Sequence, residues 1–183
     1  MKKVVSIVGM PGAGKSAVSG VFEEEGFTRV RFGDITDREV ARRGLGLSEQ
    51  NERRVRELLR QEHGMAAYAR LNLPRIDAAL KHSSVVVDGL YSWEEYLLLK
   101  ENYKDCLFLV AVWASPKIRY ARLKDRANRR LTAEEAAERD RAEIENINKG
   151  GPIAMADYTI INESSLMELE RQAKEVVLRL RCV

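Results

Sequence analysis

The chain has 183 residues, of which 45% are hydrophobic and 32% are charged, and 31 Lys and Arg against 28 Asp and Glu give a formal net charge of +3. These proportions exclude a disordered tail and a disulfide-stabilised miniprotein, and the length suits a single domain. No apolar run approaches the ~20 residues that span a bilayer, so we expect a cytoplasmic protein without a membrane partner. The charge excess is small and no lysine-rich tail concentrates it, so nucleic acid is not an expected partner.

Short apolar runs alternate with longer helical patterns along the chain. The runs cover residues 3–8, 29–32, 84–88, 107–113 and 158–162. Three of them are almost continuously apolar, which is typical of strands buried on both faces of a parallel sheet. The pattern therefore predicts a three-layer α/β fold, in which helices cover both faces of a five-stranded parallel sheet.

Helix starts are marked by capping-box patterns, in which Ser or Thr precedes Glu by three residues, and by a Ser-Pro pair. These are Ser92 with Glu95, Thr132 with Glu135, Ser165 with Glu168, and Ser115 before Pro116. Two segments are too long for simple crossovers. Residues 34–81 form a helical stretch broken by Gly44, Gly46, Gly64 and Pro74, and residues 126–152 end in Gly150-Gly151-Pro152, a predicted loop or hinge.

The strongest chemical signal directly follows the first predicted strand. It is Gly9-Met10-Pro11-Gly12-Ala13-Gly14-Lys15-Ser16, which matches the phosphate-binding pattern G-x-x-x-x-G-K-[ST]. The glycines let the backbone wrap around phosphate, and the following helix adds the positive end of its dipole. Lys15 is expected to hold the β and γ phosphates, and Ser16 to offer a hydroxyl to Mg²⁺. The motif predicts a P-loop NTPase fold that binds ATP with Mg²⁺.

Two aspartates follow predicted strands. Asp88 ends an apolar strand, where we expect it to hold Mg²⁺ through water or to orient the acceptor; alternatively it only ends the strand. Asp34 follows the second strand and should emerge at the same edge of the sheet. It is a candidate substrate ligand or general base, and the alternative is a helix N-cap. Asp37 is interpreted as a first-turn charge.

Arginines cluster in both long segments. Arg119, Arg122 and Arg126 recur at i, i+3 and i+7, which predicts one face of a helix running from Pro116 into the second segment. Phosphoryl transfer needs positive charge on the moving group, so Arg122, Arg126 and, further along, Arg139 are the candidate catalytic arginines. The alternative for each is a solvated helix face.

In the first segment, Arg38 and Arg42 follow Asp34 and are candidates for gripping an acceptor phosphate, with a solvated helix again as the alternative. Arg53, Arg54 and Arg56 alternate with glutamates, so they are interpreted as a solvated charged helix face. Tyr91, Trp93 and Tyr96 line the acceptor pocket or belong to the core, and we favour the core.

With these motifs in place, the chain resembles the nucleotide-kinase branch of P-loop proteins. Gly33-Asp34 followed by Arg38 looks like the start of the nucleoside-monophosphate-binding region of adenylate kinases, and Asp88-Gly89 looks like their Asp-Gly strand end. Residues 156–165 are similar to the end of dephospho-CoA kinases, which implies that Asn162 lies near the adenine. The chain looks most like the small family of adenylate-kinase-like and dephospho-CoA-kinase-like proteins common in archaea and also found in bacteria.

The resemblance implies one kinase domain over residues 1–183, with a core of residues 1–33, 82–125 and 153–183, an acceptor-binding insertion of residues 34–81 and a lid of residues 126–152. The leading hypothesis is transfer of the γ-phosphoryl of Mg-ATP to a small nucleotide-like acceptor. The arginines at 38–43 favour a nucleoside monophosphate. Dephospho-CoA kinase is the alternative, and a nucleotide-binding switch or slow ATPase is the alternative from another class. The sequence leaves the oligomeric state open.

Overall fold

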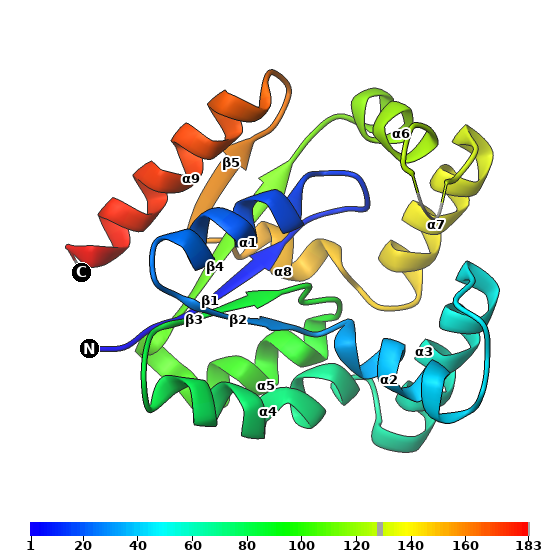
Figure 1. Cartoon of the computed structure of the whole chain (residues 1–183), viewed down its shortest axis with the longest axis horizontal. Coiled ribbons are helices and arrows are strands. Elements are labelled where there is room, and N and C mark those ends of the chain that lie inside the picture. The colour runs from blue at the N-terminus through cyan, green and yellow to red at the C-terminus, as the bar shows by residue number, and fades with distance from the viewer. Residues whose placement is uncertain (128–129, 183) are drawn as a thin grey trace.

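A five-stranded sheet lies at the centre of the computed structural model, which describes residues 1–127 and 130–182 (Figure 1). Its strands are β1 (Val4–Val8), β2 (Thr28–Arg31), β3 (Val85–Asp88), β4 (Leu107–Trp113) and β5 (Tyr158–Ile161). They run in the order β2-β3-β1-β4-β5, and every neighbouring pair is parallel. All the predicted strands are confirmed with small shifts at their ends, and so is the α/β fold.

Helices cover both faces of the sheet. They are α1 (Lys15–Glu24), α2 (Asp34–Arg42), α3 (Glu49–His63), α4 (Ala67–Leu80), α5 (Trp93–Tyr103), α6 (Pro116–Lys124), α7 (Ala133–Glu145), α8 (Gly150–Ala154) and α9 (Leu166–Arg181), with a short 3₁₀ turn at Lys104–Cys106. Helices α1 and α9 pack against each other on one face, and α4 and α5 lie on the other (Figure 1). None of the described helices is long and apolar enough to span a membrane.

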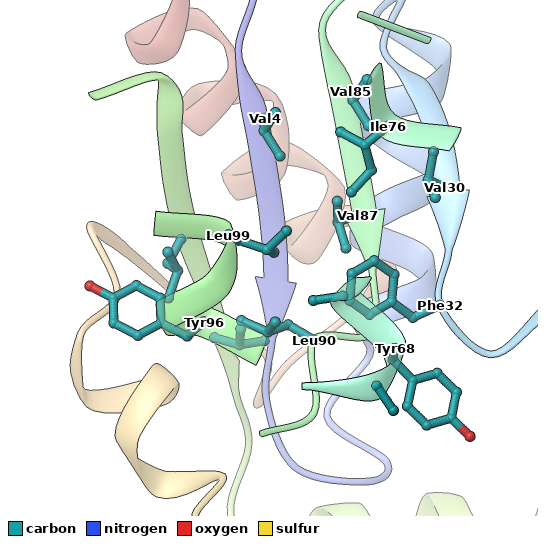
Figure 2. Close-up of a cluster of buried hydrophobic side chains, with 14 of the residues drawn as sticks. Val4, Val30, Phe32, Tyr68, Ile76, Val85, Val87, Leu90, Tyr96 and Leu99 are labelled. Carbon is teal, nitrogen blue, oxygen red and sulfur yellow. The ribbon is translucent and has the colours of Figure 1, made fainter. Parts of the chain in front are cut away.

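The central strand β1 is completely buried because alternate residues face opposite layers. Val5 and Ile7 belong to the cluster beneath α1 and α9. Val4 and Val8 belong to the other cluster, where Val85, Val87 and Leu90 pack with α4 and α5; Figure 2 shows part of this cluster. Burying each such side chain contributes about 1.5–3 kcal/mol before conformational entropy is counted. This two-sided packing fixes the strand that leads into the phosphate-binding motif.

Both long segments fold into helices, of which α2, α3 and α7 lie beyond the carboxyl ends of the strands, whereas α4 lies on a face of the sheet (Figure 1). The first forms α2, α3 and α4, and Gly64, at φ +78°, ends α3. The expected break at Pro74 is wrong, because α4 continues through it. Ala69 and Ile76, on either side of this proline, are fully buried, so packing holds the helix together.

The second segment forms α7 and leads into α8, while residues 128–129 of the predicted lid lie outside the described residues. The expected loop at Gly150-Gly151-Pro152 is wrong, since these residues form the first turn of α8. Pro152 is compatible with that turn because its missing N–H has no partner there in any helix. Gly151 packs so closely on Trp93 that an added β-carbon would come within 2.6 Å of the ring.

Two predicted capping boxes are complete. Ser92 and Thr132 each accept from the backbone N–H of the glutamate three residues on, and Glu95 and Glu135 return the interaction. The third is incomplete: Ser165 caps α9, but the carboxylate of its glutamate binds Arg171 on the next turn.

Candidate active site

The phosphate-binding motif forms a tight loop between β1 and α1. Its glycines Gly9, Gly12 and Gly14 adopt φ angles of +146°, +80° and +104°, which other residues rarely adopt. A β-carbon on Gly9 would come within 2.3 Å of the carbonyl oxygen of Val112 in β4. The loop therefore lies directly against the neighbouring strand, and its shape depends on glycine.

Side chains from three places hold the carbonyls of this loop. Lys15 Nζ donates to Gly9 O at 2.8 Å and to Met10 O at 3.1 Å. The other two bonds come from α6 and from the end of β5: Arg119 to Pro11 O at 3.0 Å and Asn162 Nδ2 to Ala13 O at 2.8 Å. With these carbonyls held by side chains, the loop and the N-terminus of α1 form an arrangement suited to an anion. Ser16 is exposed on the first turn of α1.

Lys15 lies in a strongly charged environment. Burial, and after it the ammonium of Lys149, lowers its pKa to about 7, while the carboxylates of Glu143 and Asp88 act in the opposite direction. Arg139 is the remaining cation in this group. The lysine that the sequence assigns to phosphate is therefore only partly protonated near neutral pH, and an arriving phosphate would favour its charged form.

Glu143 and Lys149 form a buried ion pair beside Lys15. Their side chains are in direct contact, and Arg139 Nε donates to the same carboxylate at 3.2 Å. Burial alone would raise the pKa of Glu143, but the charges of Lys149 and Arg139 outweigh it and lower the pKa to about 2. Arg139 was predicted from the sequence, whereas Glu143 and Lys149 were not.

Asp88 ends β3, next to β1, and its side chain is almost completely buried. Arg29 in β2 donates to its carboxylate at 2.5 Å. The carboxylate also acts electrostatically on Lys15, so it lies at the phosphate-binding end of the sheet, as predicted. Its role with Ser16 as a metal ligand stays a prediction.

Asp34 is the first residue of α2, and the N-cap is Gly33, so the N-cap alternative is wrong. Its carboxylate accepts from Arg75 at 2.8 Å and from Arg31 at 3.2 Å. Burial raises the pKa of Asp34, but the hydrogen bonds and charges of these two arginines outweigh it and lower the pKa overall. Arg31 also binds Asp37 at 2.5 Å, so Asp37 is more than a first-turn charge.

The predicted arginine face on one long helix is wrong, because α6 ends at Lys124. Arg119 is 4% exposed and forms a bidentate pair with Asp140 of α7, so it is structural. Arg122 Nη2 donates to Asn162 Oδ1 at 3.2 Å. Arg126 follows the helix and is exposed. The three arginines therefore have three different environments.

Arg38 and Arg42 are exposed on α2. Arg42 is paired with Glu39 at 2.6 Å. Both line a hollow of about 360 Å³ together with Leu59 and His63. Among the described residues, none that lines this hollow belongs to the charged group around Lys15, and the role predicted for Arg38 and Arg42 in acceptor binding stays a prediction.

A larger cavity of about 670 Å³ lies between α3 and α7. From α3 it is lined by Arg53, Arg56 and Arg60, and from α7 by Arg139 and Glu143. Arg53 and Arg54 are exposed, as expected of a solvated charged face, whereas Arg56 is largely buried, so for Arg56 that interpretation is wrong. The three α3 arginines are spaced i, i+3 and i+7, a signal of one shared face that the sequence does contain.

Tyr91 packs against the core, as favoured, and it also lines this cavity, so both alternatives hold for it. Its hydroxyl lies over Gly89, where an added β-carbon would approach it to 2.9 Å. The ammonium of Lys149 lies 5.3 Å from the centre of its ring. Tyr91 thus connects the end of β3, the buried lysine and the cavity. Trp93 packs on Gly151, and Tyr96 is buried as expected.

The parallel sheet, the loop between β1 and α1 and the two helical insertions define a P-loop kinase fold. A family model described as "AAA domain" matches residues 5–147. The UPF0200 protein TK1334 of Thermococcus kodakarensis is 40% identical over 178 residues, which cover 95% of this chain and 96% of the relative. The chain therefore belongs to this AAA-domain family and to the UPF0200 family of archaeal proteins, which confirms the P-loop kinase-like archaeal family predicted by resemblance.

Solved structures show the same fold. A gluconokinase from Sinorhizobium meliloti 1021 has a TM-score of 0.60 at 18% identity and covers 97% of this chain and 93% of its own. A shikimate kinase from Acinetobacter baumannii, solved in complex with shikimate, has a TM-score of 0.60 at 15% identity and covers 100% of this chain and 94% of its own. At these identities the likeness defines the fold and leaves the acceptor open.

Proposed function

We propose that this protein is an ATP-dependent phosphotransferase that moves the γ-phosphoryl of Mg-ATP to a small nucleotide-like acceptor, with a nucleoside monophosphate as the leading substrate. One observation carries the proposal. Arg139 and Glu143 line the cavity between α3 and α7, and the same two residues act electrostatically on Lys15. An acceptor in this cavity would lie beside the phosphates held by the loop.

The residues around the loop suit Mg-ATP. The glycine-dependent loop and Lys15 would bind the phosphates, and Ser16 and Asp88 lie at the same end of the sheet, where they would hold Mg²⁺ directly or through water. When bound, the metal neutralises part of the phosphate charge. Asn162 and Arg122, which contact each other beyond the loop, would lie on the nucleotide side.

The surroundings of Asp34 favour a phosphate acceptor over a hydroxyl acceptor. A hydroxyl benefits from a general base, and a base with a lowered pKa is a weak one. Asp34 has a lowered pKa because both of its oxygens accept from arginines. A nucleoside monophosphate already carries a nucleophilic anionic oxygen and needs no such base. Arg56 and Arg60 in the cavity offer guanidinium groups to its phosphate.

The deciding experiment incubates the protein with Mg-ATP and a panel of nucleoside monophosphates, dephospho-CoA and shikimate, and measures ADP and each phosphorylated product. Lys15→Met tests dependence on the loop, and Arg141→Ala, at an exposed arginine of α7, is the matched control. Product from one monophosphate, lost in Lys15→Met and kept in Arg141→Ala, supports the proposal.

Other results point elsewhere. Product from dephospho-CoA alone would replace the leading acceptor with the alternative. ADP without any phosphorylated product would favour a switch or slow ATPase. Absence of nucleotide turnover with every acceptor would overturn the proposed reaction.

A further inference from the structure

Three cations lie around the carboxylate of Glu143 near the loop. Lys149 and Arg139 both contact Glu143, and the same carboxylate acts on Lys15. The second carboxylate near Lys15, that of Asp88, is already paired with Arg29. Arg139 is also 3.5 Å from Glu49, at the cavity wall. Uncompensated charge inside a protein is costly, so this excess of buried positive charge suits a site that receives a multivalent anion.

Lys149 is the most buried of these cations, at 1% exposure. A lysine is almost never buried to this extent unless a partner or a ligand needs its charge. Glu143 already has Arg139, which forms an i, i+4 pair with it on α7. Lys149 is therefore a second cation on the same carboxylate, and it is far more deeply buried than Arg139.

The position of Lys149 is fixed by its surroundings. Its backbone N–H donates to the carbonyl of Glu143 at 3.1 Å, and the preceding turn is held by a bond from Trp93 N to Ile147 O at 3.3 Å. The tight contact between Gly151 and Trp93 holds the following turn. The ammonium group is thus held near the ring of Tyr91 and close enough to act on Lys15, with no need for a large movement of the backbone.

We propose that Lys149 is a second phosphate-binding lysine, which exchanges the carboxylate of Glu143 for the γ-phosphoryl group of the bound nucleotide. Glu143 acts as the partner of this lysine while no phosphate is present. The inference rests on the proposed binding of ATP at the loop and extends it to a residue outside the loop. Together with Lys15 and Arg139, Lys149 would neutralise the charge of the group in transit.

The test compares nucleotides that differ in the γ-phosphate. Lys149→Met alone would also change the charge balance around Glu143, so the comparison uses Glu143→Gln with and without Lys149→Met. Binding of Mg-AMP-PNP and Mg-ADP is measured by calorimetry, and thermal unfolding checks that both variants are folded. A charge-assisted hydrogen bond contributes on the order of tenfold or more in affinity.

We expect Glu143→Gln to bind Mg-AMP-PNP more tightly than the wild type does. Adding Lys149→Met should weaken Mg-AMP-PNP about tenfold or more and Mg-ADP less than about threefold. Lys149→Arg in the same background should restore most of the preference for the triphosphate.

A purely structural lysine would change both affinities equally, and an unchanged ratio of the two affinities would overturn the role of Lys149 while leaving the proposed function intact. If the wild type bound neither nucleotide, the proposed function itself would fail and the role of Lys149 with it.

Discussion

The side-chain amide of Asn162 lies so close to Gly14 that no side chain fits between them. Its Nδ2 donates to the carbonyl of Ala13 at 2.8 Å, and a β-carbon added to Gly14 would come within 2.4 Å of this nitrogen. The loop before α1 and the segment after β5 are therefore joined at this point, although they lie far apart in the sequence.

Gly14→Ala should impair both stability and nucleotide binding. The left-handed backbone at φ +104° costs a non-glycine residue about 1–2 kcal/mol, and the added methyl must displace Asn162. We expect a loss of about 2 kcal/mol in the free energy of unfolding, measured with urea, and at least about tenfold weaker binding of Mg-AMP-PNP.

Gly20→Ala is the matched control, since a β-carbon on this helical glycine meets nothing within 4 Å. It should raise stability by about 0.5–1 kcal/mol and leave binding unchanged. If Gly14→Ala and Gly20→Ala had the same free energy of unfolding and the same affinity for Mg-AMP-PNP, the close contact between Asn162 and the loop would be contradicted.

Asp140→Ala should be among the most destabilising single changes in α7. Arg119 donates to the carboxylate of Asp140 at 2.9 and 2.5 Å, and both residues are buried. Removing Asp140 leaves a buried guanidinium without its main anionic partner, which costs about 3–5 kcal/mol. Urea unfolding measures this loss.

Arg141→Ala, one residue further on, tests the opposite expectation. Arg141 is exposed and lies 4.0 Å from Glu145, so its loss should change the free energy of unfolding by less than about 1 kcal/mol. If Asp140→Ala and Arg141→Ala lowered the free energy of unfolding by similar amounts, the ion pair between Arg119 and Asp140 would not stabilise the protein as expected.

The strands and the phosphate-binding loop could be predicted from the sequence because their signals are local. An apolar run such as Val4–Val8 is buried whatever lies beside it, and a glycine-rich loop followed by Lys15 and Ser16 carries its own geometry. Asp88 could likewise be placed at the phosphate-binding end of the sheet, because the carboxyl ends of parallel strands all lie at that edge.

The roles of the charged helical residues could not be predicted in the same way. The spacing predicts that Arg119 and Arg122 share a helix face. Whether Arg119 meets solvent or Asp140, which is 21 residues further along the chain, depends on how α7 packs against α6. Lys149 had no local pattern at all. Its burial follows from Glu143, Tyr91 and the packing of α8 on α5, which only the folded chain brings together.

The arginines of α3 should matter more to the acceptor than those of α2. Arg56 and Arg60 line the large cavity, and Arg60 Nε is buried without a hydrogen-bond partner among the described residues. With the acceptor that the panel identifies, Arg56→Ala or Arg60→Ala should raise the KM for acceptor about tenfold or more and change the KM for ATP little.

Arg38→Ala is the control on α2, because Arg38 is exposed and lines the separate hollow. The KM of the Arg38→Ala variant for the acceptor should stay within about twofold of the wild-type value. A large effect of Arg38→Ala together with a small effect of Arg56→Ala would place the acceptor on α2, as the sequence alone suggested.

Nucleotide binding should take up a proton above pH 7. In the free protein, burial and the charge of Lys149 lower the pKa of Lys15 to about 7, so at pH 8 most of its side chain is neutral. The phosphates favour the ammonium form and raise this pKa in the complex. Affinity for Mg-ATP should therefore be level below pH 7 and fall as pH rises above 7, approaching tenfold per pH unit.

Calorimetry at pH 8 in two buffers of different ionisation enthalpy measures the proton uptake directly. Lys15→Arg is the control, because arginine stays charged throughout this range and its complex should form without taking up a proton at this position. Since the nucleotide is the same in both proteins, its own protonation cancels in the comparison. Equal uptake by wild type and Lys15→Arg would show that Lys15 is already charged before the phosphates arrive, and that the surrounding cations do not compete with it.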